Sequence, residues 1–115
     1  CMKPLYLNQE GITLYEFGKF TEEVFYIIYG KIEFYSESKD LIITYSTGTY
    51  FGEVEIFFEE PRYFTAISKQ SSELLFISKE NYLQILKKYP SKFETEIFKA
   101  YKRREFYLNK VFNSR

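Results

Sequence analysis

Residues 51–65 read FGEVEIFFEEPRYFT and combine several features that can hold one anion. Gly52 has no Cβ, so backbone N–H groups beside it can approach a phosphate without interference from a side chain. The residues after it can form one helical turn, whose N–H groups and dipole favour negative charge. Arg62 adds a planar, permanently charged guanidinium that suits a singly charged phosphodiester better than a lysine does. The segment therefore predicts a phosphate-binding site.

Glu53 lies beside this expected site, too near to an anion to be a phosphate ligand itself. A carboxylate there can instead accept a hydrogen bond from a sugar hydroxyl, as acidic residues do with ribose in nucleotide sites.

Short strands separated by turn signals are expected to position these residues. In one of them Ile32 and Phe34 alternate with Glu33, as in a strand with one buried face. About seven strands at this spacing predict a barrel or a sandwich. The expected strands are Leu5–Leu7, Ile12–Tyr15, Val24–Tyr29, Lys31–Tyr35, Leu41–Tyr45, Tyr63–Ser68 and Glu73–Ile77.

Two helices are expected after the strands, because the apolar period becomes helical there. Ser78 can cap the first helix and Pro90 ends it. The apolar face of this helix is made by Tyr82, Ile85 and Leu86. Ser91 with Glu94 three residues later has the form of a capping box and predicts the start of the second helix. The apolar positions of the second helix are Phe93, Ile97, Tyr101 and Leu108.

With these elements in place, residues 51–65 resemble the phosphate-binding cassette of the cyclic nucleotide-binding domain family. The family pattern is F-G-E, a few apolar or small residues, a short spacer, then P-R or R-R followed by small residues. The matching residues are Phe51, Gly52, Glu53, Pro61, Arg62 and Thr65. Residues 16–18, 25–32 and 74–77 and the helical SKENYLQILKKYP are also similar to the family, so the resemblance covers nearly the whole chain.

The resemblance implies a mainly β fold in which a β-roll, a double-stranded β-helix of jelly-roll type, precedes two C-terminal α-helices. The roll is expected at about residues 5–77 and the helices at about 78–112. A length of 115 residues suits one such domain, spanning residues 1–115. Because the chain begins at Cys1 without an initiating methionine, we expect it to be a segment of a longer protein.

The resemblance also implies a regulatory module without catalytic activity, which binds cAMP or cGMP and signals to an attached effector such as a channel or a kinase. The phosphate would dock on Arg62 and on the amides of residues 52–55, while Glu53 takes the ribose 2′-hydroxyl. The implied ligand-binding residues are Phe51, Gly52, Glu53, Val54, Arg62, Tyr63 and Thr65. In the family the last helix swings over the base, so three of its residues are either lid or core: Ile97, Tyr101 and Leu108.

Three residues depart from the family pattern and leave an alternative open. Glu55 stands where the family has a small residue, and its charge would repel a phosphate unless it points to water. Tyr63 and Phe64 also replace small residues; they either narrow the pocket, or one packs in the core while the other stacks on the purine. The alternative is a structural or protein-interaction module that kept the roll and lost the ligand.

Tyr63 also bears on the choice between the two cyclic nucleotides. Relatives that select cGMP often place a threonine directly after the arginine, where its hydroxyl reaches the guanine edge. Tyrosine carries its hydroxyl much farther from the backbone, so the resemblance favours cAMP over cGMP as the ligand.

Composition excludes several other functions. Lys and Arg number 16 and so do Asp and Glu, which gives no general attraction to nucleic acid or to an anionic membrane. No apolar run approaches the roughly 20 residues of a membrane span. One cysteine allows no internal disulfide, which fits a cytoplasmic location. The absence of histidine argues against a cupin-type metal centre and against Ser–His or Cys–His catalysis, so no metal or cofactor is expected.

Overall fold

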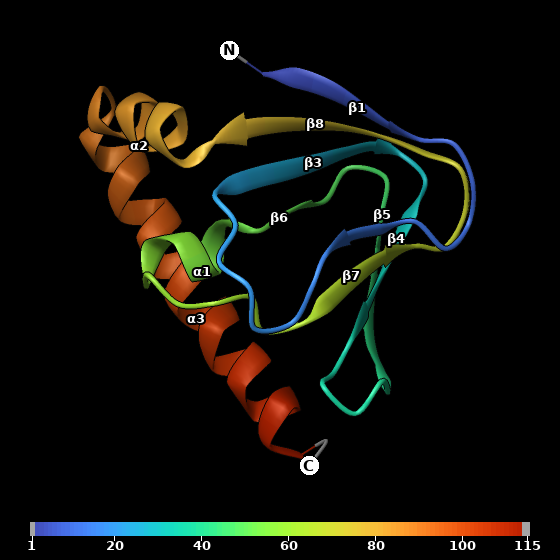
Figure 1. Cartoon of the computed structure of the whole chain (residues 1–115). Coiled ribbons are helices and arrows are strands. Elements are labelled where there is room, and N and C mark those ends of the chain that lie inside the picture. Colours follow the sequence, from blue (N-terminus) through green and yellow to red (C-terminus); the bar gives the residue numbers. More distant parts are fainter. Residues whose placement is uncertain (1, 114–115) are drawn as a thin grey trace.

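The computed structural model of the chain describes residues 2–113, so Cys1 lies outside the described residues. Within that range, eight antiparallel strands form two four-stranded sheets that enclose the core (Figure 1). One sheet has the order β1 (Lys3–Leu7), β8 (Ser72–Ser78), β3 (Glu23–Tyr29) and β6 (Tyr50–Phe51). The other has the order β2 (Thr13–Tyr15), β7 (Thr65–Ser68), β4 (Lys31–Tyr35) and β5 (Leu41–Ser46).

The helices lie together on one side of the roll (Figure 1). They are α1 (Glu53–Phe57), α2 (Lys79–Lys87) and α3 (Pro90–Asn113). The short α1 interrupts the strands between β6 and β7, and α3 runs past both α1 and α2. The prediction of a mainly β fold followed by two helices is confirmed.

Each predicted strand is present, although some bounds differ. The strand expected from Tyr63 begins only at Thr65, because the Tyr63 N–H donates to the Glu55 carboxylate rather than to a neighbouring strand. The two-residue strand β6 was not predicted, since a pairing so short leaves no periodic pattern in the sequence.

One helix start was predicted correctly and the other wrongly. The Ser78 hydroxyl caps α2 by accepting a hydrogen bond from the Asn81 N–H at 3.2 Å. The capping box at Ser91 does not form, because α3 already begins at Pro90. Proline suits the first position of a helix, where its fixed φ is helical and its missing N–H costs nothing. The Tyr89 carbonyl therefore accepts the hydrogen bond from the Phe93 N–H at 2.9 Å.

Aromatic rings fill the space between the two sheets. Phe51 stacks on Phe25 with ring centroids 5.2 Å apart and meets the edge of Phe34 at 5.1 Å. Tyr15 lies next to the same rings and is almost completely buried. Such packing holds β6 firmly against β3 and β4, and β6 leads directly into α1. The core thus fixes the start of the segment that carries the candidate site.

None of the helices within residues 2–113 has both the length and the apolar character required to cross a membrane.

Candidate functional site

Gly52 turns the chain from β6 into α1 in a conformation that favours glycine. Its φ is 92°, in the left-handed region, where a side chain is strained. A Cβ at this position would approach the Glu23 carbonyl oxygen to 2.9 Å and Arg62 Nη1 to 3.2 Å. Glycine is therefore required here by the backbone and by the arginine that lies against it.

Arg62 is buried, and its guanidinium is bonded within the protein. Nε donates to Thr21 Oγ1 at 2.6 Å. Nη1 donates to the Gly52 carbonyl at 2.7 Å, and Nη2 donates to the Glu23 carbonyl at 2.7 Å. The guanidinium carbon also lies 4.3 Å from the centroid of the Tyr15 ring, a cation–π contact. Arg62 thus ties the start of α1 to the start of β3 and to the loop before it.

Glu55 supplies the negative charge that Arg62 requires. Its Oε1 lies 3.1 Å from Arg62 Nη1, and its Oε2 accepts a hydrogen bond from the Tyr63 N–H at 3.2 Å. The two side chains are 4% and 0% exposed, so the pair is shielded from water. Glu55 therefore does not point to solvent. Its carboxylate forms an ion pair with Arg62, the residue that the family motif assigns to the phosphate.

Glu53 is paired with the last helix. Its Oε2 accepts a hydrogen bond from Arg103 Nη1 at 2.7 Å, and the same Nη1 donates to the Tyr50 carbonyl at 2.8 Å. Within residues 2–113, Glu53 Oε1 is buried without a hydrogen-bond partner. Burial raises the pKa of the Glu53 carboxyl, and the Arg103 guanidinium opposes that rise only in part. The acid that was expected to face a ribose thus fastens α1 to α3.

Replacing Glu53 by glutamine is expected to change how stability depends on pH. A carboxyl whose pKa is raised by folding stabilises the fold fully below its ordinary value of 4.5, and this contribution declines as the pH rises from there towards the folded pKa. As the pH rises through the folded pKa, the wild type loses that contribution and Glu53→Gln does not. Urea unfolding between pH 4.5 and neutral should therefore show the wild type losing free energy of unfolding relative to Glu53→Gln. Parallel pH curves for the two proteins would contradict this prediction.

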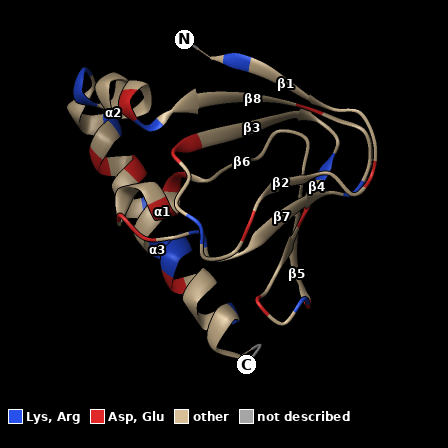
Figure 2. Ribbon diagram, in the orientation of Figure 1, with Lys and Arg blue, Asp and Glu red and all other residues tan. Residues whose placement is uncertain are grey.

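A second set of polar contacts joins α3 to the segment after α1. Glu60 Oε1 accepts hydrogen bonds from Arg104 Nε at 2.6 Å and from the Tyr63 hydroxyl at 2.7 Å. The Arg104 contact lowers the pKa of the Glu60 carboxyl, and burial together with Glu60 raises the pKa of the Tyr63 phenol. Figure 2 shows the basic stretch of α3 beside the acidic residues around α1.

Tyr107 is the residue of α3 that enters the core. The residue is only 5% exposed, and its ring meets the Phe64 ring edge-on with centroids 5.4 Å apart. Its hydroxyl lies 2.7 Å from the Tyr45 hydroxyl, on β5. No space that could hold a water molecule is left among Tyr107 and its neighbours; the residues around this point are Tyr15, Phe34, Ile43, Gly52, Glu55, Phe64 and Tyr107.

The three residues predicted as lid or core are less buried than Tyr107 on the same helix. Ile97 and Tyr101 are 38% and 53% exposed, and Leu108 is half-buried at the edge of the core. Consecutive helix positions differ by about 100°, so Tyr107 and Leu108 point in different directions. Sequence reasoning missed Tyr107; the available signal was Ala100 seven residues earlier, since two helical turns return to the same face.

The remaining predicted site residues belong to the core or to turns. Phe51 and Val54 are buried side chains of the core. The Thr65 hydroxyl accepts a hydrogen bond from the Phe17 N–H at 2.9 Å. The structure therefore brings Gly52, Glu53 and Arg62 together, but the Gly52 carbonyl, Glu53 Oε2 and the Arg62 guanidinium are bonded to protein partners.

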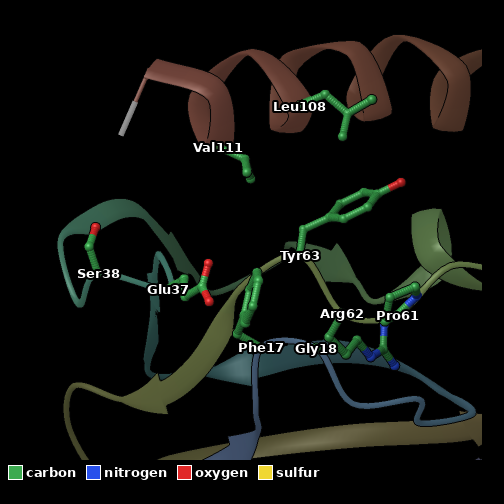
Figure 3. Close-up of a pocket in the computed structure, with 9 residues that line it drawn as sticks. All are labelled: Phe17, Gly18, Glu37, Ser38, Pro61, Arg62, Tyr63, Leu108 and Val111. Carbon is green, nitrogen blue, oxygen red and sulfur yellow. The ribbon is translucent and has the colours of Figure 1, made fainter. Parts of the chain in front are cut away.

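A cavity of about 390 Å³ lies beside this cluster, between the end of α3 and the turns of the roll (Figure 3). Figure 3 shows the Arg62 side chain running away from Leu108 and Val111, which form the helical wall of the cavity. The guanidinium is thus not offered to a ligand in this space. The residues around the cavity are Phe17, Gly18, Glu37, Ser38, Pro61, Arg62, Tyr63, Leu108 and Val111.

Comparison with known proteins gives one family. A family model described as the cyclic nucleotide-binding domain matches residues 9–89. No curated protein matches the sequence.

Many solved structures are similar to the chain, including the following three. The first, cAMP-bound PfPKA-R (141–441), is 20% identical with a TM-score of 0.75, over 96% of this chain and 37% of that one. The second, PKAR CBD2 with bound Sp-2Cl-cAMPS, is 22% identical with a TM-score of 0.79, over 96% and 72%. The third, the catabolite activator protein of Thermus thermophilus, is 21% identical with a TM-score of 0.76, over 98% and 55%. These similarities show the fold, and the chain spans about a third of the first structure's length.

Proposed function

Because the chain belongs to the cyclic nucleotide-binding domain family, we propose that it is a regulatory module of that family whose nucleotide site is filled by its own side chains. It then acts without a ligand, as a structural or protein-interaction module that holds α3 in one position for an attached effector. The observation that carries this proposal is the filled space around Tyr107, Phe64 and Phe34, where no volume is left for a water molecule. A base and a ribose cannot enter that space unless the rings move.

The contacts of α3 support the same proposal. The helix is held by Arg103 on Glu53 and by Arg104 on Glu60, and one turn further along Tyr107 packs into the core. A ligand can shift a conformational equilibrium only by its differential affinity for the two states. Here the protein's own side chains already stabilise the docked state of α3. The position of α3 is therefore set by the fold itself, and an effector attached to α3 would respond to that position.

Binding of a cyclic nucleotide is the second candidate function, and one observation favours it. Among the described residues Glu53 Oε1 finds no hydrogen-bond partner although it is buried, as a carboxylate oxygen would if it lacked a ligand hydroxyl. In this case α3 would have to leave the roll to admit the ligand. We expect such a ligand to be cAMP rather than cGMP, because the Tyr63 hydroxyl is bonded to Glu60 and is not free to contact a guanine.

Both candidates are regulatory rather than catalytic functions. An effector domain and a cytoplasmic location are part of the proposal in either case.

Titration calorimetry with cAMP and with cGMP separates the two candidates. For the folded wild-type chain we expect no saturable heat with either nucleotide at millimolar concentration, because the rings and Glu55 occupy the site. Circular dichroism of the same sample controls for folding. Saturable binding of either nucleotide to the wild type, in the micromolar range, would contradict the first candidate and support the second.

A further inference from the structure

The carboxylate of Glu55 is held in the way that an oxyanion ligand is held. Each of its oxygens accepts a hydrogen bond from a different donor, Arg62 Nη1 at 3.1 Å and the Tyr63 N–H at 3.2 Å. A guanidinium and a backbone amide that converge on one planar anion form a small anion-binding site. In this chain the occupant of the site is tethered to α1, seven residues before the arginine.

Arg62 requires an anion at this place because it is buried. Its other bonds go to the hydroxyl of Thr21 and to two carbonyl groups, and all of these acceptors are neutral. Within residues 2–113, the ion pair of Arg62 is the one with Glu55. Without that carboxylate, a guanidinium with a fully buried side chain would lack a counter-charge, which is strongly unfavourable.

We propose that Glu55 is a built-in anion for the Arg62 site, which supplies internally the negative charge that a phosphate-bearing ligand would otherwise bring. This inference rests on the proposed ligand-independent function and names the residue that makes the site independent of a ligand. It has a direct consequence. If the Glu55 carboxylate is removed, the vacated site becomes a receptor for a small carboxylate from solution.

Formate is the probe that fits this consequence, since it is the carboxylate group of Glu55 without its side chain. The Glu55→Ala variant should melt at a lower temperature than the wild type in sodium chloride. Replacing chloride by formate at equal ionic strength should raise the melting temperature of Glu55→Ala in a saturable way. The rise should be about 5 °C when formate reaches ten times its dissociation constant. The wild type should melt at the same temperature in both salts.

Two control variants show whether the effect belongs to the Arg62 site. Glu105→Ala removes an exposed carboxylate from α3 and should melt at the same temperature in chloride and in formate. The double variant Glu55→Ala/Arg62→Met lacks the anion and its receptor, and formate should not stabilise it. Equal responses of Glu55→Ala to chloride and formate, or a formate response in either control, would overturn the proposal.

Loss of folding does not prevent the test. If Glu55→Ala is unfolded in chloride, formate should restore its folded circular dichroism spectrum, and failure to do so at any formate concentration would overturn the proposal. The outcome is also separate from that of the nucleotide titration. Calorimetry on the wild type tests whether the module needs a cyclic nucleotide, whereas formate on the variant tests what Glu55 does.

Discussion

Replacement of Arg62 by alanine is expected to lower the free energy of unfolding by about 3–5 kcal/mol, the cost of breaking a buried ion pair by removing one partner. The substitution leaves the Glu55 carboxylate buried beside two carbonyl groups that lose their donor. It also removes the bond to Thr21 that fixes the loop before β3. Urea denaturation at neutral pH, followed by circular dichroism, measures the loss.

The size of this loss distinguishes a structural arginine from a ligand-binding one. In a domain that keeps Arg62 free for a nucleotide, Arg62→Ala would leave stability almost unchanged. It would instead weaken nucleotide binding by about 1.5–3 kcal/mol, the usual contribution of a charge-assisted hydrogen bond. Arg62→Lys is the matched control, because it keeps the charge and loses the planar fork. We expect Arg62→Lys to lie between the wild type and Arg62→Ala in stability.

Replacement of Tyr107 by alanine is expected to lower the free energy of unfolding by about 3–5 kcal/mol, as for other large aromatic side chains removed from a core. The change removes the ring that packs on Phe64 and the hydroxyl that bonds Tyr45. Because Tyr107 lies between Arg103 and the end of α3, the helix should also lose its fixed position. Thermal and urea unfolding measure the first effect, and hydrogen exchange of α3 amides measures the second.

Two control variants separate the ring from the hydroxyl and from the helix surface. Tyr107→Phe keeps the ring and should cost only about 0.5–1.5 kcal/mol, the net contribution of one hydrogen bond. Tyr101→Ala removes a tyrosine that is 53% exposed on the same helix, and its effect should stay within about 0.5 kcal/mol. If Tyr107→Ala costs no more than Tyr101→Ala, Tyr107 does not hold α3 on the roll.

Arg62 and Tyr107 stabilise neighbouring parts of the fold from two different elements. In this chain Arg62 holds the segment around α1 to the sheets through protein carbonyls and a protein carboxylate. Tyr107 closes the neighbouring space from the side of α3. The large expected losses of stability follow because both side chains are buried and bonded within the protein.

Much of the fold could be predicted from the sequence because its signals are local. Alternation in residues 31–35, the turn glycines and the serine before α2 depend only on near neighbours, and the predicted elements are present. The family motif also placed Gly52, Glu53 and Arg62 in one segment. One local signal was nevertheless interpreted wrongly. The helix α3 begins at Pro90, so the capping box expected at Ser91 does not form.

The sequence by itself placed Gly52, Glu53 and Arg62 in one short segment, and the tertiary structure decided which partners their polar groups bond. Arg62 meets Thr21 across 41 residues of chain, and Tyr45 meets Tyr107 across 62. No local sequence pattern predicts contacts between residues so far apart in the chain. The direction of the guanidinium and the rotation of α3 depend on which buried charges find partners and which rings fit together. A buried cation takes the nearest anion that packing allows, and here that anion is the carboxylate of Glu55.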